Sequence, residues 1–152
     1  MGDRRGLRVA DGSTLGGLAL DVAPRGVAVQ VRVNAETLRP DGTLLPGDGT
    51  LSRFQPPAGR GVRVDTAGYP GYTVSPRYDS LLAKVIAHAP DREAALRLMA
   101  RGLERFRIGG IETTAPLLHD IVSDPAFTAS PVTTRWLESE FIEPWLGTES
   151  SE

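Results

Sequence analysis

The chain has 152 residues, of which 40% are hydrophobic and 24% are charged, and its formal net charge at pH 7 is −2. These values are typical of a single globular domain with a hydrophobic core. It contains no cysteine, which excludes disulfides, thiolate metal ligands and cysteine nucleophiles. Lys84 is the only lysine, so sixteen of the 17 basic residues are arginines, but these are spread from Arg4 to Arg135 and are balanced by 19 acidic residues. This distribution argues against nucleic-acid binding.

The first 24 residues are charged and glycine-rich, which predicts a linker over 1–24 with short helical or strand pieces around Leu15 to Val22. The opening "MGDRRGLRVADGSTLGG" does not resemble the apolar core of a secretory signal. No apolar run approaches the ~20 residues that a membrane span needs. We therefore expect a cytoplasmic protein without a membrane partner.

From Val27 to about Ile86 the pattern is that of β-strands. In "VQVRVNAE", at 29–36, apolar and polar residues alternate, and Asn34 is the only asparagine in the chain. Turn signals such as "RPDG", "PPAGRG" and "YPGY" separate short apolar runs without a helix between them. This arrangement favours an antiparallel sheet or small barrel-like region, of the barrel-sandwich hybrid type, over a βαβ unit. The predicted strands are 27–34, 50–54, 61–65, 71–74 and 79–88.

After Pro90 the apolar period becomes helical. A helix is predicted from Asp91, a favourable N-cap, to about Ile108, with Gly109-Gly110 as its end. Its apolar stripe consists of Ala95, Leu98, Met99, Gly102, Leu103 and Phe106.

Two further helical segments complete the predicted fold. One begins at a Thr113 or Thr114 cap and ends before Asp124, and the other, "TTRWLESEF", contributes Trp136, Leu137 and Phe141. Residues 147–152, "GTESSE", are expected to be a disordered tail. The predicted class is α+β: an antiparallel sheet followed by two or three packing helices.

The sequence lacks the motifs of a self-contained enzyme. There is no phosphate-binding G-x-x-x-x-G-K-[ST], no dinucleotide G-x-G-x-x-G after a strand, no H-E-x-x-H and no G-x-S-x-G. "GDGTLSR" and "GRGVRV" are glycine-rich, but each has a turn role between strands. His88 and His119, without supporting cysteines, favour structural or surface roles over a metal site.

Three stretches occur together, in this order and spacing, in one known family. They are "RGVAVQVRVNAE", "GTLSRFQPPAGRGVRVDTAGYPGYTVSPRYDSLLAKVIAHAPDREAALRLM" and "IGGIETTAPLLHDIVSDPAFTASPVTTRWLE". On these residues the chain resembles the C-terminal domain of biotin carboxylase, which occurs in acyl-coenzyme A, pyruvate and urea carboxylases. The resemblance implies such a domain over 25–146. "ADGSTL", at 10–15, resembles the linker that enters it, and the long loop "TLRPDGTLLPGDG" is most similar to large multidomain acyl-coenzyme A carboxylases.

The resemblance also implies a reaction and its cofactors. The family uses ATP to activate bicarbonate and then carboxylates N1′ of biotin. ATP and Mg are bound by an ATP-grasp region, and biotin is attached to a lysine of a separate carrier, which Lys84 in "LLAKVIA" does not match. The implied partners are the ATP-grasp part of biotin carboxylase, the biotin carboxyl carrier and the carboxyltransferase. We therefore do not expect the chain to be active alone.

Three residues take roles from the resemblance. Arg32 matches the family's arginine at the ureido oxygen of biotin, where a fixed guanidinium stabilises developing negative charge. Arg63 and Asp79 match residues of the region through which the family's enzymes form homodimers. The sequence departs from the pattern nearby, with Arg60 in place of an aromatic residue. Ser75 and Arg77 also replace the usual proline and tyrosine, which places the particular dimer in question.

Other interpretations stay open at this stage. Asn34 and Glu36 match the same motif as Arg32 but favour a structural role at the strand end. Arg63 fits a solvated strand charge as well as an interface residue. The chain as a whole fits a non-catalytic module that binds carboxylase subunits, or a truncated gene remnant. The acyl acceptor is not determined here, because its choice lies in the carboxyltransferase.

Overall fold

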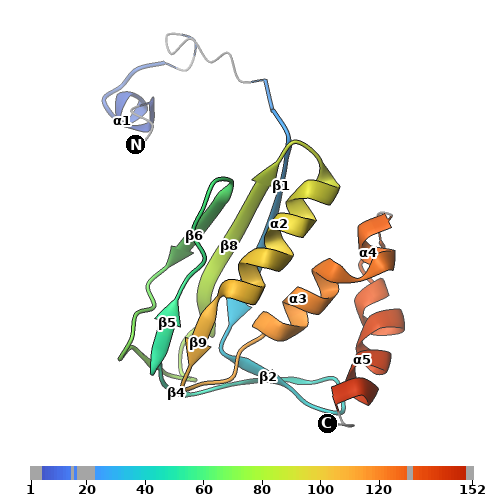
Figure 1. Cartoon of the computed structure of the whole chain (residues 1–152). Coiled ribbons are helices and arrows are strands. Elements are labelled where there is room, and N and C mark those ends of the chain that lie inside the picture. The colour runs from blue at the N-terminus through green and yellow to red at the C-terminus, as the bar shows by residue number, and fades with distance from the viewer. Residues whose placement is uncertain (1–4, 15, 17–22, 130–131, 150–152) are drawn as a thin grey trace.

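A computed structural model describes residues 5–14, 16, 23–129 and 132–149. The short helix α1 (Arg5–Ala10) precedes the main body, within the segment predicted to be a linker (Figure 1). Of the pieces predicted around Leu15 to Val22, residues 15 and 17–22 lie outside the described residues. Within the described part of the chain, no helix is both long and apolar enough to cross a membrane.

The central element is an antiparallel sheet of β1 (Val27–Asn34), β8 (Leu81–Ala89) and β6 (Val62–Thr66), in the order β1-β8-β6. The alternation in β1 places Val31 and Val33 in the core and leaves Gln30 and Arg32 exposed. In the register, Arg32 lies opposite Lys84, and Lys84 lies opposite Asp65 on the far strand. One face of the sheet is therefore apolar, and the other carries charged side chains.

Shorter strands form three antiparallel pairs, which lie toward the bottom of the view in Figure 1. β2 (Glu36–Leu38) pairs with β3 (Leu44–Pro46), β4 (Gly49–Thr50) with β7 (Thr73–Val74), and β5 (Arg53–Gln55) with β9 (Arg107–Gly109). The α+β class with antiparallel strands is confirmed. Over the described ranges, however, the strands form separate sheets rather than a closed barrel. The hairpin β2–β3 occupies a segment that was predicted to be only a loop.

Helix α2 (Arg92–Arg105) lies across the apolar face of the sheet (Figure 1). Asp91 caps it as predicted, because its Oδ1 accepts a hydrogen bond from the Ala94 amide at 2.7 Å. Leu98, predicted to lie on the packing face, is only partly buried, whereas Leu96, which the stripe omitted, is fully buried. The buried face consists of Ala95, Leu96, Met99, Gly102 and Leu103.

The end of α2 differs from the prediction. The helix stops at Arg105, before Gly109-Gly110, because Phe106 adopts an extended conformation (φ −72°, ψ 106°). The next three residues form β9, which pairs with β5. Phe106 is buried against Phe54, with ring centroids 5.2 Å apart in an edge-to-face arrangement. Pairing with a distant strand thus ends the helix, and no glycine is needed for it.

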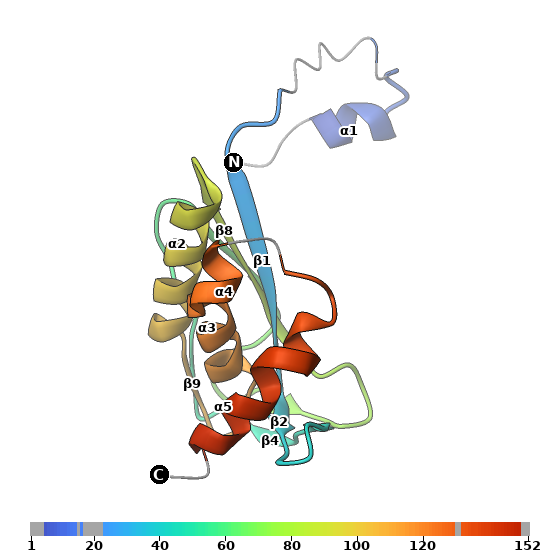
Figure 2. The ribbon, with the colours of Figure 1, turned by 90° about the vertical axis from the view of Figure 1, so that its right-hand side faces the viewer.

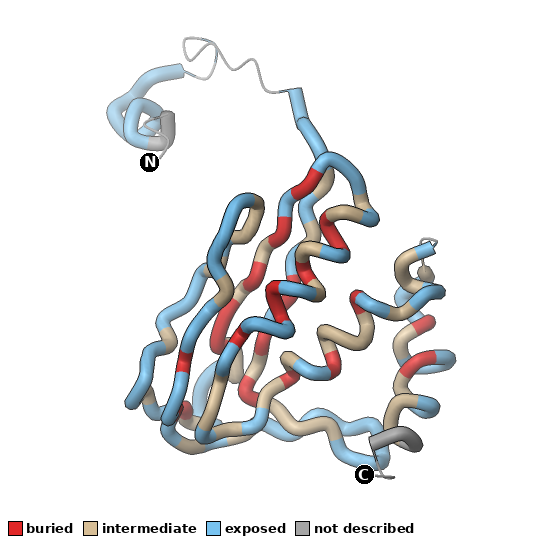
Figure 3. The backbone as a smooth tube through the Cα atoms, in the orientation of Figure 1, coloured by how far each residue is buried: buried red, intermediate tan, exposed pale blue. Residues whose placement is uncertain are grey.

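The C-terminal helices form a second layer beside α2 (Figure 2). They are α3 (Ala115–Ser123), α4 (Pro125–Ala129), the π-helical turn η2 (Leu137–Phe141) and α5 (Ile142–Glu149). Trp136 packs between Phe127 and Phe141, at centroid distances of 5.7 and 5.2 Å. Helix α5 continues through Glu149, into the segment expected to be a tail, and residues 150–152 lie outside the described part. Figure 3 shows buried residues concentrated where α2 meets the sheet, with a smaller group on the C-terminal helices.

Candidate functional site

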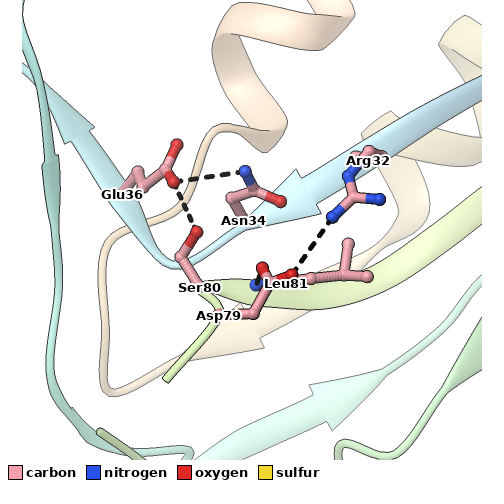
Figure 4. A network of polar contacts seen from close by, with 6 residues as sticks. All are labelled: Arg32, Asn34, Glu36, Asp79, Ser80 and Leu81. Atoms are coloured by element: carbon pink, nitrogen blue, oxygen red, sulfur yellow. Dashed lines mark hydrogen bonds and ion pairs between the residues drawn. The ribbon is translucent and has the colours of Figure 1, made fainter. Parts of the chain in front are cut away.

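Arg32 extends from the charged face of the sheet toward the start of β8 (Figure 4). Its Nη2 lies 3.4 Å from Oδ2 of Asp79, and 49% of the Arg32 side chain and 70% of the Asp79 side chain are exposed. This separation is longer than the roughly 2.7–2.9 Å of a strong charge-assisted hydrogen bond. The guanidinium is therefore loosely held by Asp79, and about half of the Arg32 side chain stays exposed.

Asp79 is fixed by the backbone rather than by Arg32. Its Oδ1 accepts a hydrogen bond from the Leu81 amide at 2.9 Å, where β8 begins. The structure thus brings together Arg32, predicted to contact biotin, and Asp79, predicted to lie at a dimer interface. The carboxylate in contact with Arg32 is that of Asp79, whereas Glu36 bonds to Asn34 and Ser80.

Glu36, Asn34 and Ser80 form a polar network beside this pair (Figure 4). Oε1 of Glu36 accepts hydrogen bonds from Asn34 Nδ2 at 3.2 Å and from the Ser80 hydroxyl. The Ala35 amide donates to the Ser80 carbonyl at 2.8 Å. The network ties the end of β1 to the start of β8, as the structural interpretation of Asn34 and Glu36 expects. Ser80 is a member that sequence reasoning missed, although it follows Asp79 directly.

A shift in register between Val33 and Asn34 accompanies this network. Such a bulge increases the local strand twist and changes the direction of nearby side chains. Asn34 Oδ1 is buried and has no hydrogen-bond partner within the described part of the chain. The irregularity lies two residues from Arg32, so it contributes to the direction in which this strand end presents its polar side chains.

The charged face continues from Arg32 to β6. Arg63 donates two hydrogen bonds to Asp65, from Nε to Oδ1 at 2.8 Å and from Nη2 to Oδ2 at 2.9 Å. This bonding lowers the pKa of Asp65 below its ordinary value and raises that of Arg63. Both side chains are solvent-exposed. Arg63 is thus paired within its own strand and not with Asp79, the other predicted interface residue.

The two histidines lie apart. His88 Nε2 is 2.7 Å from the Arg25 carbonyl oxygen, and His119 Nδ1 is 2.9 Å from Asp120 Oδ1. Asp120 also accepts a hydrogen bond from Trp145 Nε1 at 2.8 Å, which links α3 to α5. Among the residues with described positions, no group of three or more His, Cys, Asp or Glu side chains has the geometry of a metal site.

Comparison with known proteins identifies the family. A family model described as the biotin carboxylase C-terminal domain matches residues 30–139, a range that contains most of the sheet, the Arg32–Asp79 contact and α2. The chain belongs to this family.

The relatives of the chain are longer proteins. Biotin carboxylase 1 of Bacillus subtilis is 40% identical over 133 residues, covering 88% of this chain and 29% of that protein. The alpha3 subunit of the biotin-dependent acyl-coenzyme A carboxylase of Mycobacterium leprae is 37% identical over 146 residues, or 91% of this chain and 24% of that protein. The chain therefore spans less than a third of these relatives.

A solved structure agrees with the fold. The biotin carboxylase domain dimer of the 2-oxoglutarate carboxylase from Hydrogenobacter thermophilus, in complex with ADP, magnesium and bicarbonate, matches with a TM-score of 0.81. It is 38% identical and covers 92% of this chain and 30% of that one. The chain therefore has the fold of a biotin carboxylase C-terminal domain, and the Arg32–Asp79 contact lies within this fold.

Proposed function

We propose that this chain forms the C-terminal part of a biotin carboxylase and contributes Arg32 to the site where biotin is carboxylated. In this proposal ATP, Mg and bicarbonate are bound by an ATP-grasp region outside this sequence, in the cytoplasm. Biotin is brought on a carrier, and the carboxyl group passes to an acyl-coenzyme A through a carboxyltransferase. The long β2–β3 hairpin supports the acyl-coenzyme A carboxylase assignment, because the resemblance to large multidomain members rests on it.

The observation that carries the proposal is the loose attachment of Arg32. Arg–carboxylate pairs are often short and bidentate, as in the contact between Arg63 and Asp65. Arg32 instead makes one 3.4 Å contact, and about half of its side chain is exposed. An exposed ion pair of this kind contributes about 0–1 kcal/mol, so a ligand oxygen can replace Asp79 at little cost.

The residues present fit the ureido group of biotin. When bound, biotin supplies N1′, which must lose its proton before it accepts the carboxyl group. Arg32 binds the ureido oxygen, on which negative charge develops, and its permanent charge and planar donor fork stabilise and orient that oxygen. Asp79 holds the guanidinium near the site before biotin arrives. The Glu36–Ser80 network fixes the strand end from which Arg32 extends.

The charged sheet face is the second part of the proposal. Arg63 and Asp79 both lie on exposed positions at this face, and we assign it to a homodimer or to contact with other carboxylase subunits. The face lies opposite the helical layer, so a partner can cover it without displacing α2. This surface would also serve a non-catalytic module, the alternative that does not need Arg32.

A chimera tests the catalytic assignment. Residues 25–146 replace the corresponding region of Bacillus subtilis biotin carboxylase 1, and carboxybiotin formation is measured with and without Arg32→Ala. We expect an active chimera that loses biotin carboxylation in the variant. Gln30→Ala, a change on the same exposed face of β1, is the control. A chimera that carboxylates biotin equally well without Arg32 would leave only the interaction module.

A further inference from the structure

A groove distant from Arg32 lies between α2 and the loop that joins β5 to β6. Its volume is about 220 Å³. The loop approaches the helix closely, since Pro57 is 3.9 Å from the position that a Cβ on Gly102 would take. The groove is lined by Pro57, Ala58, Gly59, Arg60, Val62, Leu98, Arg101, Gly102 and Arg105. The groove is thus formed by small and apolar residues and by three arginines.

The three arginines of this groove form no ion pair in the described part of the chain. Arg101 and Arg105 are one helical turn apart on α2, and Arg60 faces them from the loop. Within the described residues, none of the three forms a hydrogen bond or an ion pair with a side chain, and no carboxylate lines the groove. Arg97, on the same helix, differs because it pairs with Glu93. Three like charges around one groove are unfavourable unless an anion or solvent screens them.

The loop adds backbone donors to the charge. The amides of Ala58, Gly59, Arg60 and Gly61 donate to no backbone acceptor in the described part of the chain. Gly61 has a φ of +80°, and a Cβ there would lie 2.6 Å from the His88 carbonyl oxygen. The loop therefore keeps this tight turn, and the amides of Ala58, Gly59 and Arg60, which line the groove or adjoin it, lie at exposed positions and are left to solvent or to a ligand. Arginines combined with backbone N–H groups are typical of anion-binding sites.

A second cavity adjoins the groove at Arg60. It is lined by Arg25, Gly26, Arg60, Gly61, His88, Ala89 and Pro90, again without a carboxylate. Arg60 borders both spaces, so positive charge continues from α2 to the start of β1. The site is separate from Arg32. In the register of β1 and β8, Arg32 lies opposite Lys84, whereas Ala28, at this end of the sheet, lies opposite His88.

We propose that this groove binds a small molecule with a phosphate or diphosphate group, held by Arg60, Arg101 and Arg105. The planar donor fork of arginine matches phosphate oxygens in bidentate fashion. A diphosphate carries enough negative charge to offset most of the charge of three guanidinium groups, and a groove of about 220 Å³ has room for a group of that size. The proposal does not depend on the role of Arg32.

Titration of the full chain with inorganic pyrophosphate tests this proposal. Binding is followed by calorimetry and by NMR of the Gly59 and Gly61 amides at low ionic strength, with orthophosphate and citrate as comparison anions. We expect saturable pyrophosphate binding that is tighter than that of orthophosphate or citrate. It should weaken as salt rises, because the contacts are exposed and screened.

Matched variants locate the site. The double variant Arg101→Gln with Arg105→Gln keeps the aliphatic stems and should weaken pyrophosphate binding at least about tenfold, the scale of a lost charge-assisted hydrogen bond. Arg97→Gln removes one positive charge from the same helix outside the groove and should leave the affinity nearly unchanged, whereas each single change, Arg101→Gln or Arg105→Gln, should weaken binding. Equal weakening by Arg97→Gln and by the changes in the groove, citrate binding as tightly as pyrophosphate, or no saturable binding would overturn the proposal. Tighter binding of an RNA oligomer through the same arginines would overturn the small-ligand assignment.

Discussion

Asn34 and Thr114 exchange two hydrogen bonds between residues that are 80 positions apart in the chain. The Asn34 amide donates to Thr114 Oγ1 at 3.0 Å, and the Thr114 amide donates to the Asn34 carbonyl at 3.0 Å. Thr114 is also the residue that caps α3, yet its side chain makes no capping bond to that helix. Its hydroxyl instead joins the end of β1 to the start of α3.

We expect Thr114→Val to destabilise the protein by roughly 1–3 kcal/mol. The isosteric valine keeps the packing but leaves the partly buried backbone amide of Asn34 without an acceptor, which costs about that much. Thr113→Val is the matched control, because Thr113 makes only a 3.4 Å contact with the Ala115 amide. Urea denaturation of both variants provides the comparison. Equal midpoints for the two would show that the inter-element bond contributes nothing measurable.

Phe106→Ala is predicted to cost about 3–5 kcal/mol, as is usual for a buried aromatic truncated to alanine. Phe106 lies at the junction of α2 and β9, and its ring contacts Phe54 edge to face. A double-mutant cycle with Phe54→Ala should give a coupling of about 0.5–1.5 kcal/mol beyond area burial. Tyr78→Ala, at an exposed position, is the control. An unchanged denaturation midpoint for Phe106→Ala would contradict the packing described for this residue.

Gly110 and Gly71 separate backbone strain from lack of space. Their φ angles are nearly the same, +94° and +90°, but a Cβ at Gly110 would lie 2.2 Å from the Thr50 carbonyl oxygen, whereas nothing is within 4 Å at Gly71. Gly71→Ala should cost only the ~1–2 kcal/mol of a left-handed alanine. Gly110→Ala should cost a further ~1–3 kcal/mol from overpacking. Thermal unfolding of both variants measures the difference, and a larger loss at Gly71 would refute this account.

Within the active chimera, Arg32→Ala should lower biotin carboxylation by roughly 10²–10³-fold, the scale for one lost preorganised oxyanion donor. Folding should change by no more than about 1 kcal/mol, because the contact with Asp79 is exposed. Biotin-independent ATP cleavage should fall much less, since it does not need the ureido oxygen to be stabilised. Arg32→Lys should restore only part of the rate, because an ammonium lacks the planar fork.

Three measurements distinguish this role from a structural one. Carboxybiotin formation and ATP cleavage are followed in the same preparation, together with the denaturation midpoint. Asp79→Asn serves as the companion variant, because it removes the only described ion pair of Arg32. It should leave much more carboxylation than Arg32→Ala does. Equal loss of carboxylation and ATP cleavage in Arg32→Ala would count against a specific contact with biotin.

Local sequence signals were sufficient where neighbouring residues determine the structure. The alternation of β1 and the Asp91 cap of α2 depend on side-chain period and on one hydrogen bond within a single turn. The family motifs likewise lie in continuous stretches, so the α+β class and the family could be predicted. Arg32 was selected because its motif is contiguous, and the structure adds only its loose contact with Asp79.

The remaining features were decided by pairing between distant residues. Helix α2 ends at Arg105 because β9, Arg107–Gly109, pairs with β5, although Gly109-Gly110 offered a later stop in the sequence. The Thr114 hydroxyl accepts a hydrogen bond from the backbone amide of Asn34 in β1 instead of from an amide of its own helix. Arg60 faces Arg101 and Arg105 only because the β5–β6 loop packs on α2. Each of these contacts links segments far apart in the chain, and its free energy outweighs a local preference that is worth only about 1 kcal/mol.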